Sequence, residues 1–128
     1  MSYLWVDHTA ELELRIDAVS EQEVLVAAMK ALAELFDGGS GPMETREVRL
    51  SAPDRGALLV QWLEELLFLA ETEGFIPKDA EIALSDGLEA AIRGNLGTPR
   101  PLVKAVTYHG LEFEPSGDGW HAKVVLDV

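Results

Sequence analysis

The chain has 128 residues, no cysteine, and 23 Asp and Glu residues against 10 Lys and Arg, which gives a formal net charge of −13. This length is typical of a single domain, and the lack of cysteine excludes disulfides, thiolate metal ligands and a cysteine nucleophile. Because phosphate backbones are bound through Lys and Arg, the charge argues against tight direct binding of nucleic acid. The charge favours a basic partner protein or a metal cation, although a need for solubility would also account for it.

No segment has the pattern of a secretory signal or a membrane span. Residues 1–7 lack a basic region followed by a long apolar run. The most apolar stretch, 58–70, is interrupted by Gln61, Glu64 and Glu65 and is too short to cross a bilayer. We therefore expect a soluble, cytoplasmic protein without a membrane partner.

The first regular elements are a strand and a helix. Apolar and charged residues alternate over 11–17, which predicts a strand with one buried face and places Glu11 on the wet face. The sequence Ser-Glu-Gln-Glu at 20–23 has the spacing of a capping box, so a helix is expected to follow it. The glycine-rich segment 37–42 ends that helix.

A second strand and a second helix come next. Residues 46–51 have the pattern of a short strand, and Asp54 then offers a helix start. The helix is expected to run from Asp54 to about Thr72 and to end before Gly74. Apolar residues recur along it at steps of three and four, on one stripe: Leu59, Trp62, Leu63, Leu66, Leu67 and Ala70.

The second half of the chain reads as strands in succession. Residues 81–84 and 88–94 flank a Ser-Asp-Gly turn, and 103–113 and 120–128 flank a segment rich in Pro, Ser and Gly. Without a linker or repeat, the order of elements predicts one α+β domain over residues 1–128. Two helices should pack on a largely antiparallel β-sheet.

Candidate metal ligands lie at the start of the first predicted strand and at the end of the last one. If the strand that begins at Glu11 lies beside the last strand, Glu11, Asp127 and the terminal carboxylate of Val128 come together as an all-oxygen set. Such a set suits calcium or magnesium better than zinc. The plainer interpretation is that Asp7 and Thr9 order a turn through their side chains and that Asp127 faces solvent.

Lys104 also has two interpretations. It either shields a sheet edge or balances the charge of Glu11 and Asp127. The sequence contains no phosphate-binding glycine loop, nucleophile elbow or Ser, His and Asp constellation that spacing would single out. The residues alone therefore do not indicate an enzyme.

Four segments together resemble the archease family. They are Asp-His-Thr-Ala-Glu at 7–11, Trp-Leu-Glu-Glu-Leu-Leu at 62–67, Val-Lys-Ala-Val-Thr-Tyr-His at 103–109, and the closing segment 120–128. The resemblance covers essentially the whole chain and keeps the order of the segments.

This resemblance implies a non-catalytic activator of the RtcB-type RNA-splicing ligase, which uses GTP and a metal to join the ends left by tRNA intron removal. The activator would promote guanylylation of the ligase and so allow multiple turnovers. By the same resemblance, a divalent metal, expected to be calcium, would be held by Glu11, Asp127 and Val128. Lys104 would be a further functional residue.

The other motif residues that the resemblance marks as functional are Asp7, His8 and Thr9.

The chain departs from the family pattern in two places. Glu11 stands where the family usually has Asp. The flexible coordination geometry of calcium accepts the longer side chain better than the octahedral coordination geometry of magnesium does. The segment 97–102, before Lys104, is shorter than in relatives, so contact with the partner is expected to differ there.

Two other functions would use the same residues. One is a metal-dependent enzyme that acts on a small phosphoester substrate by activating water at the carboxylate cluster. The other is a general chaperone or adaptor for several RNA-modifying enzymes.

Overall fold

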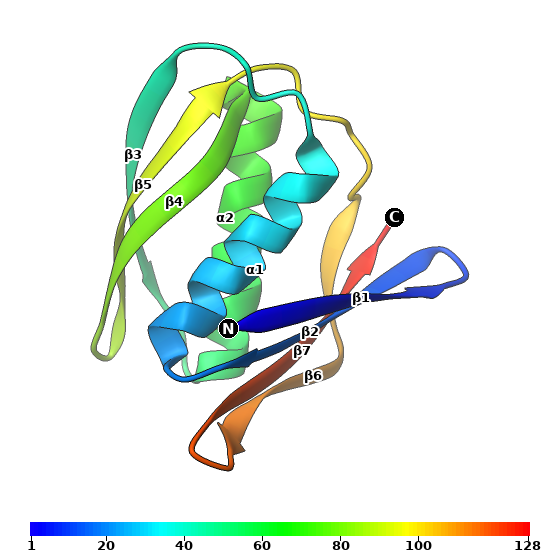
Figure 1. Ribbon diagram of the computed structural model, residues 1–128, viewed down its shortest axis with the longest axis vertical. Coiled ribbons are helices and arrows are strands. Elements are labelled where there is room, and N and C mark those ends of the chain that lie inside the picture. The colour runs from blue at the N-terminus through cyan, green and yellow to red at the C-terminus, as the bar shows by residue number, and fades with distance from the viewer.

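The order of elements in the structure, a computed structural model that describes residues 1–128, is ββαβαββββ (Figure 1). The strands are β1 (Ser2–His8), β2 (Glu11–Ala18), β3 (Met43–Ser51), β4 (Phe75–Leu84), β5 (Gly87–Leu96), β6 (Ala105–Ser116) and β7 (Gly119–Asp127). The helices are α1 (Glu21–Phe36) and α2 (Arg55–Glu73).

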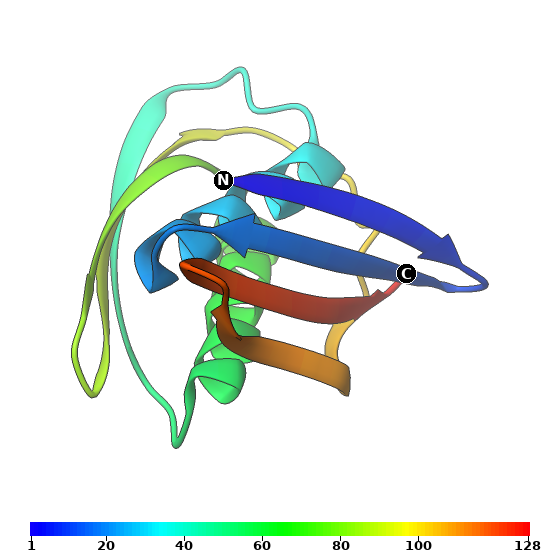
Figure 2. The same ribbon diagram turned by 60° about the horizontal axis from the view of Figure 1, so that its bottom comes forward.

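All strand pairs are antiparallel, and the strands form two sheets. One sheet has the order β1-β2-β7-β6 and the other has the order β3-β5-β4. Both helices lie between the sheets, as Figure 1 shows, and Figure 2 shows the four-stranded sheet in front of them. The expected α+β class is confirmed, with the strands divided between two sheets.

The helices begin and end where their capping residues predict. The backbone N–H of Glu23 donates to the Ser20 hydroxyl at 3.1 Å, and the N–H of Ala57 donates to the Asp54 carboxylate at 2.8 Å. Gly74 ends α2 in the left-handed conformation, with φ of 66°, which a glycine adopts without steric penalty. Neither helix has the length and apolar character that a bilayer crossing requires.

The strand β1 is the element that the sequence patterns did not predict. It forms a hairpin with β2, in register from Ser2 opposite Asp17 to His8 opposite Glu11. The predicted strands in 46–51 and 81–84 are also longer than expected, since β3 starts at Met43 and β4 starts at Phe75. The predicted strand over 103–113 becomes β6, which starts at Ala105 and continues to Ser116.

The core lies between the two sheets and around both helices. Trp62 of α2 is fully buried, and its indole N–H donates to the backbone carbonyl of Leu25 on α1 at 2.9 Å. From the four-stranded sheet, Leu14 and Ile16 of β2 and Val124 of β7 pack into the same cluster. The face of β2 and β7 that bears Glu11 and Asp127 therefore points away from the helices.

Two aromatic residues of α2 give a matched test of this core. Trp62→Ala is expected to lower the free energy of unfolding by about 3–5 kcal/mol, because it opens a cavity and removes the link to α1. Phe68→Ala, at a position that is 55% exposed, should change it by less than about 0.5 kcal/mol. Urea denaturation measures both values, and equal losses would contradict the packing described here.

Candidate functional site

Glu11 and Asp127 lie directly opposite each other on neighbouring strands. They are Cα partners at the end of the β2–β7 pair. Next to them, the N–H of Val128 donates to the carbonyl of Ala10 at 3.2 Å. The predicted meeting of the two chain segments is therefore present in the fold.

The hydrogen-bond pattern brings these two side chains close together. Opposite residues in an antiparallel pair alternate between hydrogen-bonded and non-hydrogen-bonded positions. Since Ala10 and Val128 occupy a hydrogen-bonded position, the next pair, Glu11 and Asp127, occupies a non-hydrogen-bonded one. Opposite side chains have Cβ atoms about 4.5–5.5 Å apart, and they are closer in non-hydrogen-bonded pairs than in hydrogen-bonded ones. The two carboxylates project side by side from the face of the sheet that the helices leave open, called the outer face below.

Lys104 reaches the same end of the sheet through its backbone. Its N–H donates to the carbonyl of Asp127 at 2.7 Å, and its side chain is exposed. The segment before it is tied to the end of α1, because the N–H of Arg100 donates to the carbonyl of Phe36 at 2.7 Å. The backbone of Lys104 is thus fixed beside Asp127, but the Cα partner of Asp127 is Ala105, and Lys104 forms no ion pair with Glu11 or Asp127.

The residues of the first motif divide between the two faces of the sheet. His8 is the Cα partner of Glu11 and shares its face, whereas Asp7 is the partner of Leu12 and has the opposite phase. Thr9 lies in the two-residue turn with Ala10, whose φ is 60°. Neither Asp7 nor Thr9 uses its side chain in a hydrogen bond. Backbone pairing closes this hairpin, so the turn-ordering interpretation of Asp7 and Thr9 is not supported.

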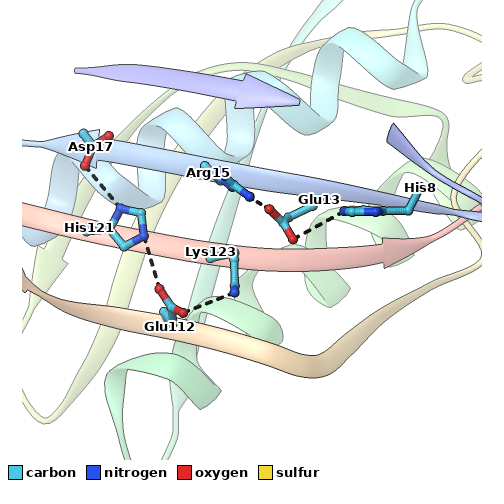
Figure 3. A network of polar contacts seen from close by, with 7 residues as sticks. All are labelled: His8, Glu13, Arg15, Asp17, Glu112, His121 and Lys123. Atoms are coloured by element: carbon cyan, nitrogen blue, oxygen red, sulfur yellow. Dashed lines mark hydrogen bonds and ion pairs between the residues drawn. The ribbon is translucent and has the colours of Figure 1, made fainter. Parts of the chain in front are cut away.

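Glu13 is the one charged side chain that the fold buries, with 8% of the residue exposed. On the outer face, its carboxylate accepts a hydrogen bond from Arg15 Nε at 2.5 Å and lies 3.6 Å from Nε2 of His8 (Figure 3). The hydrogen bond from Arg15 lowers the pKa of Glu13 against the opposing effect of desolvation, and the charges of Arg15, Lys123 and His8 add to the lowering.

A second polar group links three strands on the outer face. His121 of β7 lies between Asp17 of β2, at 3.2 Å, and Glu112 of β6, at 3.3 Å. Lys123 lies 3.2 Å from the other oxygen of Glu112, as Figure 3 shows. The hydrogen bond from Lys123 is the main cause of a lowered pKa at Glu112. These contacts connect the polar side chains of β2, β7 and β6 across the sheet.

The donor chemistry at the chain ends fits a hard cation. Like charges placed directly opposite on neighbouring strands repel each other, and a cation between Glu11 and Asp127 would remove that repulsion. No group of three or more His, Asp and Glu side chains gathers around one point. The side chains at this end of the sheet therefore supply two carboxylates, fewer oxygen ligands than the six to eight that calcium takes.

The principal hollows of the surface lie elsewhere. The largest, about 760 Å³, lies on the three-stranded sheet and is lined in part by Glu47, Arg49 and Glu89. None of the four main hollows is lined by Glu11 or Asp127. The carboxylate pair, whose two residues are half-buried, therefore lies at the end of a sheet and outside these four hollows.

Comparisons with known proteins give one consistent result. The Archease protein family matches residues 3–128. Protein archease of Methanosarcina acetivorans is 36% identical over 139 aligned residues, which cover 98% of this chain and 95% of the relative. Protein archease of Archaeoglobus fulgidus is 32% identical, and the alignment covers both chains fully.

The chain belongs to the archease family. Solved structures agree with this assignment. The solution structure of Protein 1598 from Methanobacterium thermoautotrophicum has a TM-score of 0.79 at 28% identity and covers 98% of both chains. The crystal structure of an archease from Thermotoga maritima, described as a possible chaperone, has a TM-score of 0.74 at 25% identity and covers 96% of this chain and 94% of that one.

The part of this archease fold that sequence reasoning missed is the polar network of the outer face. The period-two pattern placed Glu13 and Arg15 on the wet face and gave no reason to separate Glu13 from Glu11. A usable signal was the sequence Glu-Leu-Glu-Leu-Arg at 11–15. It puts a cation two residues from Glu13 on the same face, at the spacing that an ion pair along one strand requires.

Glu13 makes the stability of this archease chain depend on pH. Its folded-state pKa is lowered from the ordinary 4.5, so its contribution is fully present above that pH and is lost as the pH falls through the lowered pKa. Glu13→Gln should lower the free energy of unfolding at pH 7 by about 1 kcal/mol, because solvent reaches Arg15 and screens the pair.

Urea denaturation of the variant and the wild type over a range of pH tests this dependence. The two proteins should converge in acid, below the lowered pKa. Glu114→Gln, at an exposed position on the same sheet, is the matched control and should follow the wild type at every pH. A constant difference between Glu13→Gln and the wild type across the whole range would contradict the assigned role.

Proposed function

We propose that this archease-family chain is a non-catalytic activator of an RtcB-type RNA-splicing ligase, in which it promotes guanylylation and multiple turnover. The observation that carries the proposal is the convergence of Glu11, Asp127 and the backbone of Lys104 at one end of the sheet. These are the positions that the family resemblance marks as functional. The position of the pair outside the four main hollows supports contact with a partner protein more than turnover of a small substrate.

A divalent cation, with calcium as the first candidate, is part of this proposal. Glu11, Asp127 and the carboxylate of Val128 would hold it, and water would complete the coordination. When bound, the ion supplies positive charge at the sheet end. The chain's own residues then have distinct tasks: the two carboxylates hold the ion, and the exposed side chain of Lys104 offers a positive charge to the partner at the same end of the sheet. The absence of cysteine agrees with a cytoplasmic setting.

A general chaperone is the second candidate, because the Thermotoga maritima relative is described as a possible chaperone. The two functions differ in their partners. An activator of one ligase binds that ligase alone, whereas a chaperone binds several unrelated RNA-processing enzymes with comparable affinity. Calorimetric titration against a panel of such enzymes separates them.

Charge removal at Asp127 tests the proposed activation. Asp127→Asn should reduce stimulation of ligation at least about tenfold when the cognate ligase is limiting, because one cation ligand becomes neutral. Asp118→Asn makes the same change in the turn before β7, at an exposed position. It should stimulate as the wild type does. Full stimulation by Asp127→Asn, with an unchanged unfolding midpoint, would count against the proposal.

Calcium binding is measured separately from ligation. The wild type should show a calcium-dependent rise in the unfolding midpoint, since an ion that binds the folded state stabilises it. Glu11→Gln should remove most of this rise, and Glu11→Asp should keep it because the flexible calcium sphere accepts either acid. Titration calorimetry gives the affinities. A rise that persists in Glu11→Gln would place the ion elsewhere.

A further inference from the structure

The two sheets have four edge strands, and one of them has less protection against further pairing than the other three. The edges are β1 and β6 in one sheet and β3 and β4 in the other. Edge strands present unpaired N–H and C=O groups to solvent, and natural proteins usually block them with charges, proline or bulges. From Ser2 to His8 the strand β1 has no proline and no register shift, and its only ionisable side chains apart from Tyr3 are Asp7 and His8 at its last two positions.

Each of the other three edges carries such a device. In β6 the register shifts between Thr107 and Glu112, with Gly110 at φ of 64° inside the shifted segment. The strand β4 contains Pro77 and a register shift directly after it. The strand β3 is charged at four of its nine positions, which are Glu44, Arg46, Glu47 and Arg49. The edge open to strand addition is therefore β1.

The hydrogen-bond pattern identifies which backbone groups of β1 are free. Because Ala10 is hydrogen-bonded to Val128 of the chain segment after β7, the even residues of β2 bond to β7 and the odd residues bond to β1. The β1 partners of those odd residues are Ser2, Leu4, Val6 and His8. Tyr3, Trp5 and Asp7 consequently direct their N–H and C=O groups toward the open edge.

The side chains along this edge indicate what kind of segment fits it. On the outer face, Leu4 is 58% exposed, and Val6 is the next residue of the same phase. On the other face, Asp7 is exposed, and the Tyr3 hydroxyl donates to the exposed carboxylate of Glu34 on α1. An added strand would meet Leu4 and Val6 on one face. On the other face it would meet the half-buried rings of Tyr3 and Trp5, with Glu34 beside Tyr3 and Asp7 at the far end.

We propose that β1 accepts an extended segment of the partner protein as a fifth strand of the sheet, and that this segment alternates basic and apolar residues. Its basic residues face Asp7 and Glu34, and its apolar residues cover Leu4 and Val6. The net charge of −13 favours such a basic segment over a second copy of this chain. Main-chain hydrogen bonds supply affinity in this mode of binding, and the alternating side chains supply specificity. The choice of ligase as the probe rests on the proposed function.

Amide hydrogen exchange with and without the RtcB-type ligase of the same organism tests the inference. The amides of Tyr3, Trp5 and Asp7 should gain protection in the complex, whereas those of Leu4 and Val6 are bonded to β2 already and should change little. This odd and even contrast is specific to strand addition, since simple coverage of the surface would protect neighbouring amides alike.

Two matched substitutions accompany the exchange experiment. Leu4→Lys should weaken binding to the ligase about tenfold in titration calorimetry, because it places a cation where the segment is apolar. Met43→Lys changes an exposed apolar residue of the β3 edge in the same way and should bind as the wild type does. If Leu4→Lys does not fold, the exchange pattern of the wild type still decides the question.

Each outcome has a separate meaning. A ligase that binds the wild type without protecting the odd amides, and that binds Leu4→Lys equally well, would overturn the strand addition and leave the proposed function standing. No binding to the wild type would overturn both. Protection of the odd amides that grows with protein concentration in the absence of ligase, together with a dimer in sedimentation, would assign the edge to a second copy and refute the partner segment.

Discussion

The pairing of β2 with β7 is the contact on which both the four-stranded sheet and the candidate site depend. It runs without a register shift from Glu11 opposite Asp127 to Ala18 opposite Trp120. A slip of one residue would turn every side chain to the other face. The fully buried Leu14 and Ile16 would then face solvent, and the carboxylates would enter the core. The hydrophobic pattern of two strands thus determines where the acidic pair lies.

On the outer face, some acidic side chains have a basic partner and others have none. Glu13 and Glu112 each have a basic side chain within hydrogen-bonding distance, and both have a lowered pKa for that reason. None of the ion pairs involves Glu11 or Asp127, although they lie opposite each other. Negative charge is therefore concentrated where the strands end, and this is the region to which a cation or a basic partner would be drawn.

Local signals explain what could be predicted from the sequence. Asp54 and Gly74 mark the ends of α2, and the alternation over 11–17 and 120–128 predicted the two strands that bring Glu11 to Asp127. The strand β1 escaped prediction because its apolar residues lie in both phases, as Tyr3 and Leu4 show. The division into two sheets depends on pairing between distant segments, which no local pattern encodes. The lowered pKa of Glu13 depends on side chains from three strands, those of His8, Arg15 and Lys123.

Glu11 and Asp127 are 116 positions apart in the sequence, yet they form one of the neighbouring pairs of the sheet. Contacts between distant segments form slowly in folding. Closing a long loop lowers the conformational entropy of the chain before the new contact contributes any stabilising free energy. A chain that has folded only its helices and local hairpins does not display this acidic pair. A partner that recognises the pair would therefore distinguish molecules in which β2 and β7 have paired from molecules in which they have not.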